Sequence, residues 1–145
     1  MEINIEPNPY VPHIERFECS NEFKYLANIF NETGFYTHLQ EGTEAYINFW
    51  KDVKEKCIYG FTNSKGIRIT GHHFFYLNFC RISGYDKTTG KKTEIFPNFV
   101  DLDYEYFHMI EYCEKHQKCL IALKGRRQGW SYKAAAICAW EFTFF

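Results

Sequence analysis

Apolar residues recur at helical spacing in two N-terminal segments of the chain. In SNEFKYLANIFN, apolar positions three and four apart follow Ser20, a typical N-cap, and precede Gly34, a typical helix terminator. The second segment lies between Thr43 and Gly60, and its apolar face comprises Ala45, Tyr46, Phe49, Trp50, Val53 and Cys57. The pattern therefore predicts two amphipathic helices, preceded by a proline-rich irregular arm.

The periodicity changes in GIRITGHHFFYLNFCRI, which is rich in β-branched and aromatic residues and has breaks at Gly66 and Gly71. These features favour two strands. Along a strand, His72 and His73 would point to opposite faces, so both side chains could not chelate one ion, and we expect them to be surface or turn residues instead. A turn-rich loop, SGYDKTTGKK, then leads to a third extended piece, TEIFPNF, which ends at Pro97. We expect a small antiparallel strand block over 56–98, after an arm and helical region over 1–55.

The C-terminal part, 99–145, combines helical and strand patterns. DLDYEYFHMIEYCEKH predicts one amphipathic helix, beginning near Asp101 or Asp103, and WSYKAAAICAWEFTFF predicts another. Between them, KCLIALK is a short, almost continuous apolar run, which is typical of a strand buried on both faces of a mainly parallel sheet. An α/β nucleotide-binding domain begins with this order of elements: a helix, a buried strand, a glycine-containing loop and a second helix.

Composition narrows the class of protein. The chain has 145 residues, 20% aromatic residues and a formal net charge of −1, so it suits a folded domain with no general attraction to nucleic acid. No apolar stretch is long enough to span a membrane, and the N-terminus does not resemble a signal peptide. The six cysteines form no Cys-x-x-Cys pair, which favours free thiols in a cytosolic compartment. Cys113, His116 and Cys119 offer only three ligands, split between helix and strand, so the end of a helix is favoured over a zinc site.

The segment LKGRRQGWSYKAAA has the chemistry of a phosphate-binding loop except for its usual lysine, because Trp130 occupies that position. Such a loop presents backbone N–H groups at a helix N-terminus, while a hydroxyl binds Mg²⁺ and a lysine neutralises phosphate charge. Ser131 supplies the hydroxyl and Lys124 can supply the charge, whereas we expect Lys133 to point towards solvent or a neighbouring element. The expected nucleotide-binding residues are Lys124, Gly125, Arg126, Arg127, Gln128, Gly129, Trp130 and Ser131. The alternative is a basic, solvated turn between a strand and a helix.

KGRRQGWS resembles the deviant Walker A loop of the large terminase subunit of tailed bacteriophages, the ATPase that drives DNA packaging. In that family the lysine has moved to the start of the loop, and Lys124, Arg127, Gly129 and Ser131 match the pattern. KGIRITGHHFFYLNFCRI is similar to the family's strand pair ahead of the ATPase core, and FPNFVDLDYEYFHMIEY to the segment on the adenine side. The resemblance extends over about 50–145.

The resemblance implies the start of a RecA-like ATPase core with Mg-ATP as ligand. It also implies a motor that acts in the cytoplasm of the infected bacterial host. Its partners would be the remainder of the large subunit, the small terminase subunit, the portal protein and duplex DNA. The family's Walker B aspartate, catalytic glutamate and nuclease ligands do not appear in this sequence. We therefore expect an N-terminal part of the motor that contains no catalytic residues and is inactive alone.

A second interpretation comes from a different class of protein: a small nucleic-acid-binding or protein-interaction module that has a basic strand–helix turn. Its support is the aromatic content, since Tyr and Phe side chains on a sheet can stack on bases. Aromatic residues spread over every segment are more typical of a core than of a stacking platform, and the net charge is close to zero. The terminase interpretation is therefore favoured.

Overall fold

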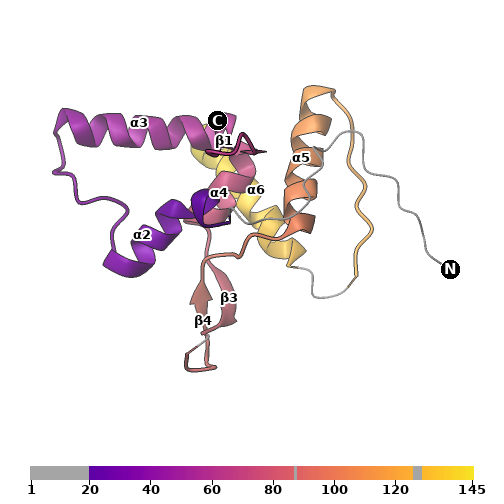
Figure 1. Cartoon of the computed structure of the whole chain (residues 1–145). Coiled ribbons are helices and arrows are strands. Elements are labelled where there is room, and N and C mark those ends of the chain that lie inside the picture. The colour runs from indigo at the N-terminus through magenta and orange to yellow at the C-terminus, as the bar shows by residue number, and fades with distance from the viewer. Residues whose placement is uncertain (1–19, 87, 126–128) are drawn as a thin grey trace.

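The computed structural model describes residues 20–86, 88–125 and 129–145, and it combines helices with two small antiparallel strand pairs (Figure 1). None of the described helices has both the length and the apolar character that crossing a membrane requires. The elements are α1 (Ser20–Phe23), α2 (Tyr25–Thr33), α3 (Glu44–Tyr59), β1 (Phe61–Thr62), β2 (Arg68–Ile69), α4 (Gly71–Phe79), β3 (Ile82–Tyr85), β4 (Lys92–Ile95), α5 (Asp101–Lys115) and α6 (Trp130–Phe144).

The two predicted N-terminal helices are confirmed, with one interruption. Lys24 separates α1 from α2, and Gly34 ends α2 in the left-handed conformation at φ 78°, which favours glycine. Helix α3 begins after Thr43, whose side-chain oxygen accepts a hydrogen bond of 3.2 Å from the backbone N–H of Tyr46. It ends at Gly60, as predicted. The terminating glycines and the threonine cap therefore gave reliable helix boundaries.

The prediction of two strands between Gly66 and Ile82 is wrong, because most of that segment forms helix α4. Thr70 caps this helix by accepting a hydrogen bond of 3.3 Å from the backbone N–H of His73. Seven of its residues are buried, namely Gly71, His72, His73, Phe74, Tyr76, Leu77 and Asn78. A helix buried on every side has no polar face, so the 3.6-residue period that identifies a helix disappears. The predicted strands remain only as β2 and β3.

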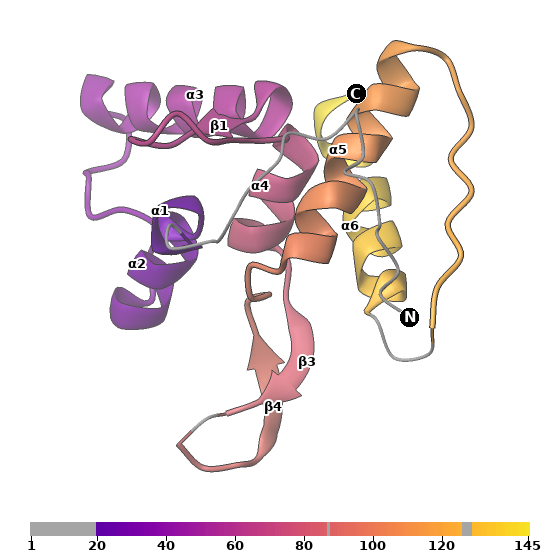
Figure 2. The ribbon, with the colours of Figure 1, turned by 45° about the vertical axis from the view of Figure 1, so that its right-hand side comes forward.

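The hairpin formed by β3 and β4 projects from the helical part of the molecule (Figure 2). The two strands are antiparallel, and Ile82 pairs with Ile95. The third predicted extended piece is thus confirmed as β4, with Pro97 shortly after it. A second, shorter antiparallel pair joins β1 to β2. The described residues therefore form no parallel sheet.

Helix α4 lies at the centre of the fold and packs against α2, α3, α5 and α6 (Figure 1). The main core around it is built from α1–α4, β2 and α5, and a smaller cluster joins α4, α5 and α6. Many aromatic side chains pack against one another there, and the Phe23 and Phe99 rings stack with centroids 5.2 Å apart. The main core contains Phe23, Leu26, Val53, Cys57, Ile69, Phe74, Leu77 and Tyr104.

Gly71 allows α4 to cross α3 at very close range, and we expect Gly71→Ala to destabilise the protein. An added Cβ would overlap the backbone carbonyl oxygen of Cys57 and lie 2.7 Å from that of Ile58. Both atoms belong to helix backbone and cannot move separately, so we expect a loss of roughly 1–3 kcal/mol in unfolding free energy. Urea denaturation measures this loss.

The matched control is Gly42→Ala, where the added Cβ meets no atom within 4 Å but φ is +80°. We expect that variant to lose about 1 kcal/mol, from its backbone conformation alone. A Gly71→Ala protein as stable as the wild type would contradict the close helix crossing.

Helices α5 and α6 are confirmed, but the buried strand predicted between them is wrong. The described residues after α5, up to Gly125, have no regular secondary structure and lie apart from the helices in both views (Figures 1 and 2). Ile121 is 87% exposed and Leu123 is 96% exposed. A strand buried on both faces needs neighbouring strands, and no described residues pair with this segment. The apolar run is therefore an exposed, irregular connection.

Candidate functional site

The predicted phosphate-binding loop connects the exposed segment to the N-terminus of α6. Lys124 and Gly125 lie at the exposed end of that segment, whereas the predicted site residues Arg126, Arg127 and Gln128 lie outside the described residues. Gly129 directly precedes α6 and has φ 68°, in the left-handed region that favours glycine. Ser131 is exposed in the first turn of this helix. The described part of the loop thus ends in a glycine turn into a helix, which is one part of the predicted context, whereas the strand expected ahead of the loop is not formed by the described residues.

Trp130, the residue at the usual lysine position, attaches the start of α6 to α5. Its ring lies edge-on to that of Tyr106, with centroids 4.5 Å apart. The indole Nε1 is buried and has no hydrogen-bond partner among the described residues. A buried indole N–H normally finds an acceptor, so this donor is an exception among the described residues.

A buried ion pair joins the first turns of α5 and α6. The Lys133 ammonium contacts the carboxylate of Asp103, and the two residues are only 2% and 5% exposed. The Lys133 Nζ also lies 5.3 Å from the centre of the Trp130 ring. Burial raises the pKa of the Asp103 carboxyl, and the Lys133 ammonium opposes that rise. Lys133 therefore points towards a neighbouring element, one of the two directions expected for it.

A cavity of about 270 Å³ lies beside this ion pair. Tyr76, Asn98, Asp103, Gly129 and Lys133 are among its lining residues, so it adjoins the N-terminus of α6. Binding sites for whole small-molecule ligands usually exceed about 300 Å³. The volume lies near the lower end of that range, and it has room for a phosphate-sized group.

Asp103 and the cavity are the features of this region that the sequence did not reveal. Asp103 was expected only as an acidic residue at a helix start, and its pairing with Lys133 joins two helices separated by the whole connecting segment. The sequence signal for this pairing is Lys133 beside the alanines of KAAA. A lysine on an otherwise small and apolar helix face is buried only with an oppositely charged partner.

The remaining candidate ligands are arranged differently from the expectation. His72 and His73 lie on helix α4 rather than on a strand, so the argument from opposite strand faces does not apply, and the expectation that they are surface or turn residues is wrong because both are buried. Cys113 is buried near the end of α5, His116 ends that helix, and Cys119 is exposed. These last three do not form a ligand cluster in the described part of the chain.

No family model, curated protein or solved structure matches the chain. The resemblance to the large terminase subunit therefore depends on the residues of the loop and its flanking segments. The geometry that bears on it is local: a left-handed glycine, an exposed serine in the first turn of a 15-residue helix, and an exposed lysine ahead of the loop.

Proposed function

We propose that this chain is the N-terminal, ATP-binding part of a DNA-packaging motor of the large terminase type. The observation that carries the proposal is the spacing of Lys124, Arg127, Gly129 and Ser131 across the start of a long helix, of which Ser131 is the second residue. Backbone N–H groups at that helix terminus would bind the phosphates, and the Ser131 hydroxyl would bind Mg²⁺. The positive N-terminal end of the helix dipole would favour the negative charge of the ligand.

Lys124 would replace the missing lysine of the loop. It is exposed at the loop's first position, so its ammonium is accessible to a ligand. Lys133, the next lysine along the chain, is buried against Asp103 and already neutralises a carboxylate. Moving Lys133 to a phosphate would leave a buried, unpaired carboxylate, which is energetically unfavourable. This contrast supports Lys124 as the phosphate-binding lysine.

The exposed apolar segment before the loop supports a role as one strand of a larger, RecA-like sheet. Ile121 and Leu123 are the kind of residue that parallel sheets bury, yet both are almost fully exposed. The remainder of the large subunit would supply the neighbouring strands and the acidic residues for ATP hydrolysis. Such a motor would act on duplex DNA with the small terminase subunit and the portal protein, in the cytoplasm of the infected bacterial host.

We expect Lys124→Ala to weaken Mg-ATP binding by roughly 10- to 100-fold, because a charge-assisted contact to phosphate is lost. Isothermal titration calorimetry on the full 145-residue chain measures the affinity. Lys51→Ala is the matched control, since Lys51 is an exposed lysine on α3 and the same charge is removed. That control is expected to bind Mg-ATP as the wild type does.

Equal binding by Lys124→Ala and the wild type would rule out the relocated lysine. Lys133 is tested in a variant with both partners of its ion pair replaced, Asp103→Leu with Lys133→Met, so that no buried charge is left unpaired. Loss of Mg-ATP binding in that folded double variant alone would assign the phosphate contact to Lys133. Thermal stabilisation of the wild type by single-stranded DNA, and not by Mg-ATP, would favour the nucleic-acid-binding module instead.

A further inference from the structure

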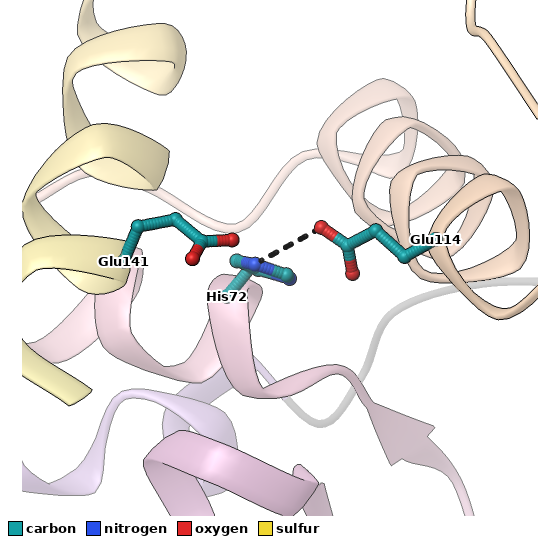
Figure 3. A group of neighbouring side chains, drawn as sticks. All are labelled: His72, Glu114 and Glu141. Atoms are coloured by element: carbon teal, nitrogen blue, oxygen red, sulfur yellow. Dashed lines mark ion pairs between the residues drawn. The ribbon is translucent and has the colours of Figure 1, made fainter. Parts of the chain in front are cut away.

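Three side chains with metal-binding atoms converge where α4, α5 and α6 meet (Figure 3). His72 comes from the first turn of α4, Glu114 from the end of α5, and Glu141 from the last part of α6. One ligand atom from each residue lies within 4.8 Å of the other two. Figure 3 shows both carboxylates directed towards the imidazole from opposite sides. The cluster is at the far end of α6 from the loop, so it is separate from the proposed nucleotide site.

The imidazole of His72 supplies an observation beyond the two acidic residues. His72 is only 4% exposed, and its Nε2 forms no hydrogen bond. The nearest carboxylate oxygen, Oε1 of Glu114, is 3.5 Å away, which exceeds ordinary hydrogen-bond length. A buried ring nitrogen without a hydrogen bond is unfavourable unless another group satisfies it. This nitrogen faces the space between two carboxylates, where a cation would bind.

The orientation of the His72 ring is fixed by its neighbours. The ring of Trp140 packs on it, with centroids 3.9 Å apart. The indole Nε1 of Trp140 donates a hydrogen bond of 2.6 Å to the carbonyl oxygen of Cys57, so the tryptophan is itself anchored to α3. A preoriented imidazole is what a metal site requires, because little ordering remains to be done on binding.

The charges around the cluster also favour a bound cation. Burial lowers the pKa of His72 to about 4, partly opposed by the negative charge of Glu111. Burial raises the pKa of Glu114, and the negative charges of Glu141 and Glu111 raise it further. A divalent ion between the two carboxylates would neutralise this repulsion.

We propose that His72, Glu114 and Glu141 bind one divalent transition-metal ion, of which Zn²⁺ is the representative, and that the ion joins α4, α5 and α6. An imidazole nitrogen with carboxylate oxygens suits Zn²⁺, Mn²⁺ or Co²⁺ better than Mg²⁺ or Ca²⁺, which take oxygen ligands. Metal–ligand bonds are about 2.0–2.2 Å, so the exposed glutamates must move inwards slightly. With three protein ligands, the fourth position is left to solvent.

The test is Zn²⁺ binding by the full chain after treatment with a chelator and dialysis. We expect one equivalent to bind and to raise the melting temperature, because an ion that binds only the folded state stabilises it. Glu114→Gln and Glu141→Gln are each expected to weaken Zn²⁺ binding by roughly 10- to 100-fold or more. Loss of a residue that only hydrogen-bonds to a metal ligand already has an effect of that size. Both glutamates are exposed, so these variants should fold even if a change at the buried His72 does not.

Two controls separate this site from other ways of binding zinc. Glu105→Gln removes an exposed carboxylate from α5 away from the cluster and is expected to bind Zn²⁺ like the wild type. Cys119→Ser removes one of the two exposed thiols of the described residues, the other being that of Cys138, and is expected to do the same. Loss of binding in Cys119→Ser, unchanged binding in both glutamine variants of the cluster, or no binding by the wild type would each overturn the proposal.

Discussion

Lys133→Met is expected to lower the free energy of unfolding by about 3–5 kcal/mol, the loss typical of a buried ion pair with one partner removed. The substitution keeps the length of the side chain but leaves the carboxylate of Asp103 buried without its ammonium partner. The first turns of α5 and α6 would then no longer be joined by opposite charges. Chemical denaturation followed by far-UV circular dichroism measures the loss.

The double variant Asp103→Leu with Lys133→Met is expected to recover most of that stability. Replacing both members of a buried pair with apolar residues is often neutral, because no charge remains to be desolvated. Lys51→Met is the matched control, since it removes an exposed lysine and should change stability by less than about 0.5 kcal/mol. If the single and double variants were equally destabilised, packing rather than charge would be responsible.

We expect Asn78→Ala to destabilise the protein by roughly 3–5 kcal/mol, because three buried hydrogen bonds would be lost together. Asn78 is fully buried on α4, and its Nδ2 donates to the carbonyl oxygens of Phe23 and Phe74, each at 2.9 Å. Its Oδ1 accepts a bond of 3.1 Å from the backbone N–H of Ala27. One side chain therefore attaches both α1 and α2 to the central helix. Thermal or urea unfolding gives the loss directly.

Asn48→Ala serves as the comparison, because Asn48 is exposed on α3. It is expected to change stability by less than about 0.5 kcal/mol. Asn78→Asp keeps the oxygen acceptor but loses both donors, so it should also be strongly destabilised. A loss below about 1 kcal/mol in Asn78→Ala would show that these bonds do not attach the N-terminal helices to α4.

The helices that were predicted correctly are those with a capping or terminating residue at an end. Thr43 caps α3 through its own side chain, and Gly34 and Gly60 end helices with positive φ. Each of these effects depends on a few neighbouring residues, so it can be recognised in a linear sequence. Helix α4 has the same kind of signal in Thr70, but its buried, aromatic-rich surface favoured a strand pattern instead.

The strand predicted over 118–124 was wrong for a different reason. Its apolar run is compatible with a buried strand, but burial requires partner strands, and those are not present among the described residues. The glycine turn at Gly129 and the position of Ser131 at the start of α6 could be predicted from the sequence because both depend on local spacing, whereas phosphate binding there stays a prediction. The pairing of Asp103 with Lys133 and the meeting of His72, Glu114 and Glu141 could not, since both arise from packing between distant helices.

The exposed segment 118–125 would have a thermodynamic effect on the proposed nucleotide binding. Fixing the backbone of one residue is unfavourable by about 1–2 kcal/mol of conformational entropy. A ligand that ordered this segment by binding at the loop would have to offset part of that entropy loss. Packing Ile121 and Leu123 between neighbouring strands would offset it instead, through burial of their apolar surface. Sheet assembly and phosphate binding would then be positively coupled, and each would strengthen the other by the same factor. In the proposed motor, the affinity for ATP would therefore increase as this segment packs into the sheet.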